Sequence, residues 1–190
     1  MRLHISASVL LALALLTPGA VHAQHASAAK NAALSAEQNA AGSSGAAQPK
    51  DTLLLTAGTN HAPISISPAD FRDMPHVTVK VHNAHADADE TYSGVPLAAL
   101  LAKLDAPLGE HLRGKALASC IVATGSDGYS VVLSIAEADP SFHGGEILVA
   151  DTRDGQPLGK NGPLQLIVSE DKRPARWVHN LVSISMQDAR

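Results

Sequence analysis

Three cations and an indole lie within six residues near the end of the sequence. The set is Lys172, Arg173, Arg176 and Trp177. Arginine offers a planar fork of donors and lysine a compact charge, so these side chains suit a phosphate or another anionic group. The flat indole could also stack on a heterocycle. The alternative is a solvated loop whose cations pair with Glu170 and Asp171. The first interpretation predicts a small-molecule or anionic ligand.

Histidines in two other loops offer nitrogen ligands. His82 and His85 lie three residues apart and are followed by carboxylates up to Glu90, a set that could hold a divalent metal ion. The spacing matches no established zinc signature, and a merely polar loop is the alternative. His143 precedes two glycines, where the backbone can approach a ligand closely. The alternative there is a plain turn between two elements.

Cys120 is the only cysteine, so an intrachain disulfide is impossible. It lies in an apolar run, residues 118–123, with no basic neighbour in sequence that would lower the pKa of its thiol. We therefore predict a small buried core residue rather than a nucleophile or a metal ligand. The sequence contains no glycine-rich phosphate loop, paired-cysteine motif or serine nucleophile elbow.

The first 23 residues have the pattern of a secretory signal peptide. A weakly basic start leads into an apolar run, residues 5–16, which is short for a span of about 20 residues. A small-x-small cleavage site follows at 21–23. An uncleaved membrane helix is the alternative. We expect a periplasmic or secreted protein with no membrane insertion after cleavage.

Residues 24–50 and 51–190 differ sharply in composition. The first range is Ala, Ser, Gly, Gln and Asn with little to bury, and we predict a flexible linker. The second has the length of one ordinary domain. The net charge of −4 becomes −5 once the single Arg of the signal peptide is removed, and only 3% of residues are aromatic. These features argue against nucleic-acid binding.

The predicted elements change from mixed to strand-rich along the domain. Strands are expected over 52–56, 76–82 and 182–186, because apolar residues there alternate or cluster. Ser67 and Pro68 mark the start of a short helix. Leucines at 97, 100, 101 and 104 mark a second helix with one apolar face.

Residues 117–168 form the predicted β core. Two hairpins are expected, with Asp-Gly turns at 127–128 and 154–155. Ser134 and Glu137 have capping-box spacing, which predicts a short helix between the hairpins. The order of elements indicates an α+β domain.

Several of these segments, in this order, resemble the molybdopterin-binding domain of the sulfite oxidase family, and in particular its small exported single-domain members. The resemblance covers roughly residues 52–186. It is carried by segments 92–101, 123–129, 147–158, 162–168 and 176–184.

The resemblance implies a fold with a mixed, curved, barrel-like β core and short peripheral helices. In the enzymes of this family a pterin dithiolene carries molybdenum, and one protein cysteine completes its sulfur ligation. They transfer oxygen atoms to or from small molecules such as sulfite or sulfoxides. The family places a cofactor-contacting stretch where Lys172, Arg173, Arg176 and Trp177 lie here, and His143 would join them.

The sequence departs from the family at the metal ligand. The ligating cysteine of the enzymes precedes the segment that matches 92–96, at a position that falls near His82 or Asn83, where no cysteine stands. Molybdenum in this setting needs a soft thiolate. The first 23 residues also lack a twin-arginine pair, which favours export without a preassembled cofactor.

Our leading hypothesis is an exported, cofactor-free relative that acts as a binding or accessory module. Its pocket is expected between the 82–90 loop, the turn at His143 and the 172–177 loop. One alternative is a molybdopterin-dependent oxidoreductase, which leaves a redox partner open. Another is a divalent-metal binder that uses His82 and His85.

Overall fold

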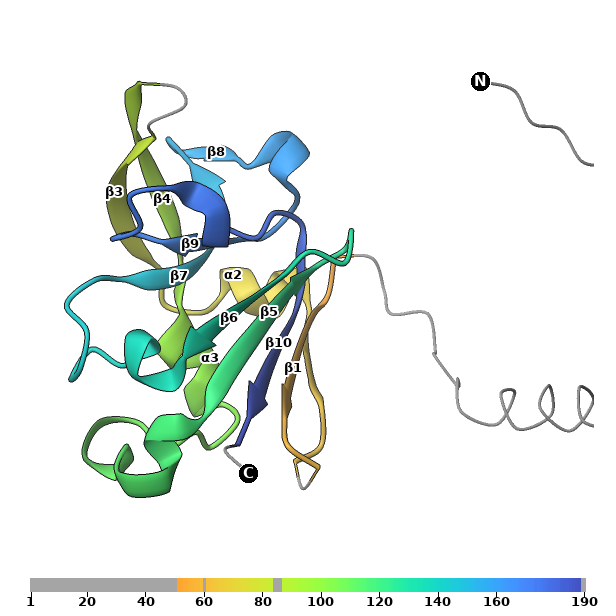
Figure 1. The fold of residues 1–190 in the computed structure, drawn as a ribbon. Helices are drawn as coiled ribbons and strands as arrows, with labels where there is room; N and C mark the ends of the chain where they lie inside the picture. The colour runs from red at the N-terminus through yellow and green to blue at the C-terminus, as the bar shows by residue number, and fades with distance from the viewer. Residues whose placement is uncertain (1–50, 60, 84–86, 189–190) are drawn as a thin grey trace, which may run out of the picture. The chain divides into compact units, whose positions relative to one another are not determined.

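A computed structural model describes residues 51–59, 61–83 and 87–188 of the protein (Figure 1). These residues contain two α-helices and ten strands, and the strands form two sheets. The predicted α+β class is therefore confirmed. The predicted signal peptide and linker lie outside the described residues. No helix in the described part of the chain has the length and apolar character needed to cross a bilayer.

The first sheet is mixed. β1 and β10 run parallel, and the other neighbours pair antiparallel. The predicted hairpin with its turn at 127–128 forms here, and Gly128 takes the left-handed conformation that such a turn needs (φ 84°). In spatial order the strands are β2 (Ile64–Ile66), β1 (Leu53–Ala57), β10 (Leu181–Gln187), β5 (Cys120–Gly125) and β6 (Ser130–Ser134).

The second sheet is antiparallel throughout. Its strands are β3 (Val77–Asn83), β4 (Ala88–Pro96), β7 (Ile147–Arg153) and β8 (Gln156–Pro157), with β9 (Gln165–Val168) also paired to β7. The prediction that the polar loop extends to Glu90 is wrong. β4 begins at Ala88, because residues 88–94 pair with β3. The two-residue period of a strand then turns Glu90, Tyr92 and Gly94 inward.

The predicted β core is divided between the two sheets, as Figure 1 shows. Its first hairpin, β5–β6, belongs to the first sheet, whereas β7, β8 and β9 belong to the second. The two sheets nevertheless share one cluster of buried apolar side chains. Backbone hydrogen bonds also join them, since Leu166 donates to Val178 and Leu181 to Leu164, each at 2.9 Å.

Short helices surround the sheets, as predicted. In α2 (Pro68–Arg72) the hydroxyl of Ser67 caps the helix by accepting from the backbone N–H of Asp70. α3 (Leu97–Ala102) and the turn after it bury the four predicted leucines. The remaining helical turns are the 3₁₀ helices η1 (Gly109–His111), η2 (Gly114–Ala118), η3 (Ile135–Ala138), η4 (Gly159–Asn161) and η5 (Pro174–Arg176).

Gly94 marks the closest approach between β4 and β7. The register of this pair shifts between Ser93 and Gly94, as in a β-bulge. A Cβ at Gly94 would lie 2.5 Å from the Cα of Ala150 and closer still to the carbonyl oxygen of Val149. Both obstacles are backbone atoms, so the pair of strands would have to separate to admit a side chain.

We expect Gly94→Ala to lower the free energy of unfolding by about 2 kcal/mol or more, because the added methyl group overpacks two backbones. Urea unfolding followed by circular dichroism measures the change. Gly144→Ala is the matched control, since a Cβ there meets nothing within 4 Å; it should change stability by about 0.5 kcal/mol at most. Equal effects of the two substitutions would contradict this account of Gly94.

Candidate functional site

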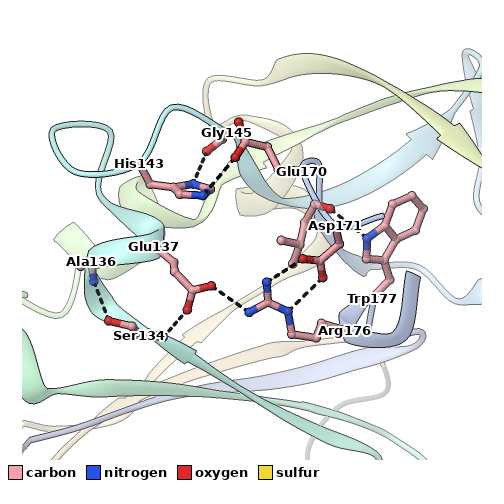
Figure 2. Close-up of polar contacts among 10 residues, drawn as sticks. Ser134, Ala136, Glu137, His143, Gly145, Glu170, Asp171, Arg176 and Trp177 are labelled. Atoms are coloured by element: carbon pink, nitrogen blue, oxygen red, sulfur yellow. Dashed lines mark hydrogen bonds and ion pairs between the residues drawn. The ribbon is translucent and has the colours of Figure 1, made fainter. Parts of the chain in front are cut away.

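Arg176 holds two carboxylates at once (Figure 2). Its Nε and Nη2 donate to Asp171 at 2.9 and 2.6 Å, a bidentate pair, and Nη1 donates to Glu137 at 2.8 Å. These hydrogen bonds to Asp171 and Glu137 raise the pKa of Arg176. The alternative of a cation paired with carboxylates of its own loop therefore holds for Arg176, and the predicted role of this residue in phosphate binding stays a prediction.

Glu137 is fixed by its backbone as well as by Arg176. Its carboxylate accepts from the backbone N–H of Ser134 at 2.8 Å, which completes the predicted capping box at the start of η3. Burial opposes ionisation of Glu137, but the hydrogen bonds from Arg176 and Ser134 outweigh it and hold its pKa below the ordinary value of 4.5. The ion pair thus links η3 to the loop that follows β9.

Lys172 and Arg173 differ from Arg176 in being solvent-exposed. Neither makes an ion pair with another residue in the described ranges. Both charges are therefore available to an anion arriving from solvent, although exposure weakens such contacts.

Trp177 is buried, with 7% of its surface exposed. Its indole Nε1 donates to the carbonyl oxygen of Val168 at 3.0 Å, and its ring meets Tyr92 edge to face at 5.6 Å. Trp177 also lines a cleft of about 260 Å³ together with Tyr129 and His179. Trp177 therefore packs onto the domain, and its predicted stacking on a heterocycle stays a prediction.

His143 reaches the same loop from the other side. Its Nε2 lies 3.1 Å from Glu170, and its Nδ1 lies 3.3 Å from the carbonyl oxygen of Gly145 (Figure 2). A Cβ at Gly145 would collide with the side chain of Glu170, so the absence of a side chain at Gly145 leaves room for the Glu170 carboxylate. The structure therefore brings the turn at His143 into contact with Glu170, two residues before the 172–177 loop. The predicted pocket between the 82–90 loop, this turn and the 172–177 loop stays a prediction.

His82 lies apart from this network, on the β3–β4 hairpin. It is exposed, and its Nδ1 lies 3.1 Å from Asp89, whose other oxygen accepts from Lys80 at 2.9 Å. His85 lies outside the described residues. No group of three potential metal ligands gathers anywhere in the described ranges. The predicted metal role of His82 and His85 stays a prediction.

A buried polar network occupies the end of β3, where the family resemblance places the metal ligand. Glu90 accepts from the Tyr92 hydroxyl at 2.8 Å, from the Asn83 amide at 3.1 Å and from Arg153 Nη1 at 3.4 Å. Burial and the hydrogen bond to Glu90 raise the pKa of Tyr92 to about 12. We did not predict this network, although the alternation of Glu90 and Tyr92 on a strand could have indicated it.

The donor atoms at this position do not fit a thiolate-ligated molybdenum. Cys120 stands at the start of β5, in the other sheet, opposite Ser134 and Gln187. It is half-buried rather than buried, which corrects our prediction. The reason is the alternation of the strand: Cys120 shares the half-buried face with Val122, whereas Ile121 lies on the buried face. Around Asn83 the structure places oxygen and nitrogen groups, which are hard ligands.

A cavity that sequence reasoning missed lies at the edge of both sheets. Its volume is about 400 Å³, and it opens between α2, the strands β7 and β8, and the loop around η4. Its lining combines residues from positions 51 to 164, so no local pattern in the sequence could have indicated it.

We expect Arg176→Gln to destabilise the protein by about 1–2 kcal/mol at pH 7. The value is small because the side chains of Arg176 and Glu137 are 36% and 32% exposed, so solvent screens their ion pair. The stability that Glu137 contributes is complete above pH 4.5 and is lost as the pH falls through its lowered pKa. The difference between variant and wild type should therefore narrow in acid. Thermal unfolding at pH 7 and pH 3.5 tests this. Arg173→Gln is the matched control and should change stability little at either pH.

Tyr92→Phe should cost about 1–3 kcal/mol, because the buried Glu90 loses a donor. Tyr129→Phe removes a hydrogen bond at the surface and should cost less. Tyr129→Phe also leaves Tyr92 as the single tyrosine, since the chain has two. In this variant the ultraviolet titration of the Tyr92 hydroxyl should centre near pH 12. Ionisation near pH 10 with an intact circular dichroism spectrum would contradict the buried network.

No family model matches the sequence, and no curated protein matches it. Among solved structures, the sulfane dehydrogenase SoxCD from Paracoccus pantotrophus has a similar fold, with a TM-score of 0.56 at 18% identity. The alignment covers 74% of this chain and 39% of that chain, so this protein spans less than half of its neighbour's length. At this identity the likeness shows the fold alone, which is distantly sulfite-oxidase-like.

Proposed function

We propose that this protein is an exported relative of the molybdopterin-binding domain that has lost molybdenum catalysis and acts as a binding or accessory module. The fold shared with SoxCD supports the relationship. The observation that carries the loss of catalysis is the position near His82 and Asn83. The amide of Asn83 points a donor at Glu90 there, and the single thiol lies in the other sheet.

The chemistry of the network around Glu90 supports this proposal. Each oxygen of the Glu90 carboxylate already accepts a hydrogen bond, and the guanidinium of Arg153 balances its charge. A cluster satisfied in this way stabilises the fold and presents no soft ligand to a metal. It therefore suits a structural role at the place where the enzymes carry out chemistry.

The binding role that we propose uses charge on the 172–177 loop. The side chains of Lys172 and Arg173 are exposed cations, and the ion pair between Arg176 and Asp171 holds the loop in its conformation. His143 contacts Glu170, which precedes the loop. A small anionic molecule in the periplasm, or outside the cell, is the ligand that these charges would attract.

The rival is a molybdopterin-dependent oxidoreductase, and the likeness to a dehydrogenase favours it. That function would require the pterin to bind without protein thiolate ligation near Asn83. The metal content of the native protein separates the two candidates.

We expect protein purified from its native host to contain far less than one molybdenum per chain. Inductively coupled plasma mass spectrometry of the full chain makes the measurement. A molybdoenzyme purified from the same cells is the control, because its full loading shows that molybdenum supply was adequate. Stoichiometric molybdenum in this protein would overturn the proposal and establish the rival.

A further inference from the structure

The cavity between the two sheets has an apolar floor. Four buried side chains form it: Ile66, Phe71, Leu158 and Leu164. They come from β2 of the first sheet, from α2, and from the loop around η4, which follows β8 of the second sheet. A volume of about 400 Å³ lies at the lower end of the range for small-molecule sites, about 300–1,000 Å³.

Two opposite charges on the walls of this cavity have no ion-pair partner among the described residues. Asp51 and Arg72 both line it and are exposed to solvent. Neither forms an ion pair with the other or with any other residue of the described part. A third charged group, Asp151, lies 3.2 Å from Nε2 of His76 and is therefore engaged.

From this arrangement we infer that the cavity binds a small zwitterion with an apolar side chain, such as a free apolar amino acid or a dipeptide of such residues. Arg72 takes the carboxylate, because a guanidinium matches a carboxylate with paired donors. Asp51 takes the ammonium group, and the apolar side chain covers Phe71 and its neighbours on the floor.

The pairing of charges selects this class of ligand over its simpler relatives. A ligand that carries only a carboxylate would leave Asp51 unpaired, and one that carries only an amine would leave Arg72 unpaired. A neutral apolar molecule would use the floor and neither charge. A zwitterion uses all three features, and each charged contact increases its affinity over these relatives.

This site is separate from the 172–177 loop and does not need molybdenum to be absent. It goes beyond the proposed function, because it names a second site and the class of ligand that this site would take. The outcome of the molybdenum measurement and the outcome below are therefore independent.

Isothermal titration calorimetry on the full chain tests the inference with four probes: L-phenylalanine, a phenylalanyl-leucine dipeptide, phenethylamine and 3-phenylpropionate. We expect one of the two zwitterions to bind at least about tenfold more tightly than phenethylamine or 3-phenylpropionate, because each of these lacks one charged contact. Which zwitterion binds more tightly distinguishes the amino acid from the dipeptide.

Variants then assign the contacts. Arg72→Gln and Asp51→Asn should each weaken binding of the preferred zwitterion by about tenfold or more. Arg72→Gln should spare phenethylamine, and Asp51→Asn should spare 3-phenylpropionate. The matched controls are Arg113→Gln and Asp105→Asn, which remove exposed charges outside the cavity lining. Asp105 also shares the positive φ of Asp51, so this pair is conformationally matched.

Two outcomes would overturn the inference. One is the absence of measurable heat with either zwitterion at millimolar concentration. The other is an affinity for the zwitterion that is the same in the two cavity variants, Arg72→Gln and Asp51→Asn, as in the two control variants. Circular dichroism of each variant shows that a loss of binding is not a loss of fold.

Discussion

The guanidinium of Arg176 is the contact on which the arrangement of loops depends. It joins η3, which follows the first sheet's edge strand, to the segment that leaves β9 in the second sheet. Because one planar group binds a carboxylate of η3 and a carboxylate of the loop after β9, it fixes the path of the 169–177 segment. That path places Trp177 against Tyr92, and Tyr92 in turn holds Glu90 within the second sheet. A chain of polar and aromatic contacts thus runs from one sheet into the other.

A polar network lies at each end of this series of contacts. In both networks the charged groups are hydrogen-bonded to other side chains of the protein. Arg176 is paired by Asp171 and Glu137, while Glu90 receives donors from three side chains. Groups that could bind a cofactor are instead bound to one another. These contacts stabilise the fold and leave fewer free donors, acceptors and charges for a ligand. A fold that resembles an oxidoreductase can therefore support a binding function, since activity depends on the groups at the site and not on the fold.

The groups that remain available lie elsewhere. Lys172 and Arg173 face solvent on the loop that Arg176 anchors, and Asp51 and Arg72 face the cavity beside α2. In both places the charge is exposed to solvent. In the cavity beside α2 these charges accompany an apolar floor, and an apolar lining with a few polar groups is typical of small-molecule sites.

The sequence by itself determined the local elements. Ser67 and the leucines of α3 predicted the helices, the Asp-Gly turns predicted the hairpins, and Ser134 with Glu137 predicted the capping box, because each of these depends on residues a few positions apart. Only the tertiary structure decided that the two hairpins lie in different sheets, that Arg176 faces carboxylates and that Asp51 shares a cavity with Arg72. These outcomes depend on contacts between residues far apart in the sequence, 39 positions for Glu137 and Arg176, for which local spacing carries no signal. The sequence shows that the family's ligating cysteine is missing near Asn83. Which side chains occupy that position depends on the pairing of β3, β4 and β7, and only the tertiary structure shows them.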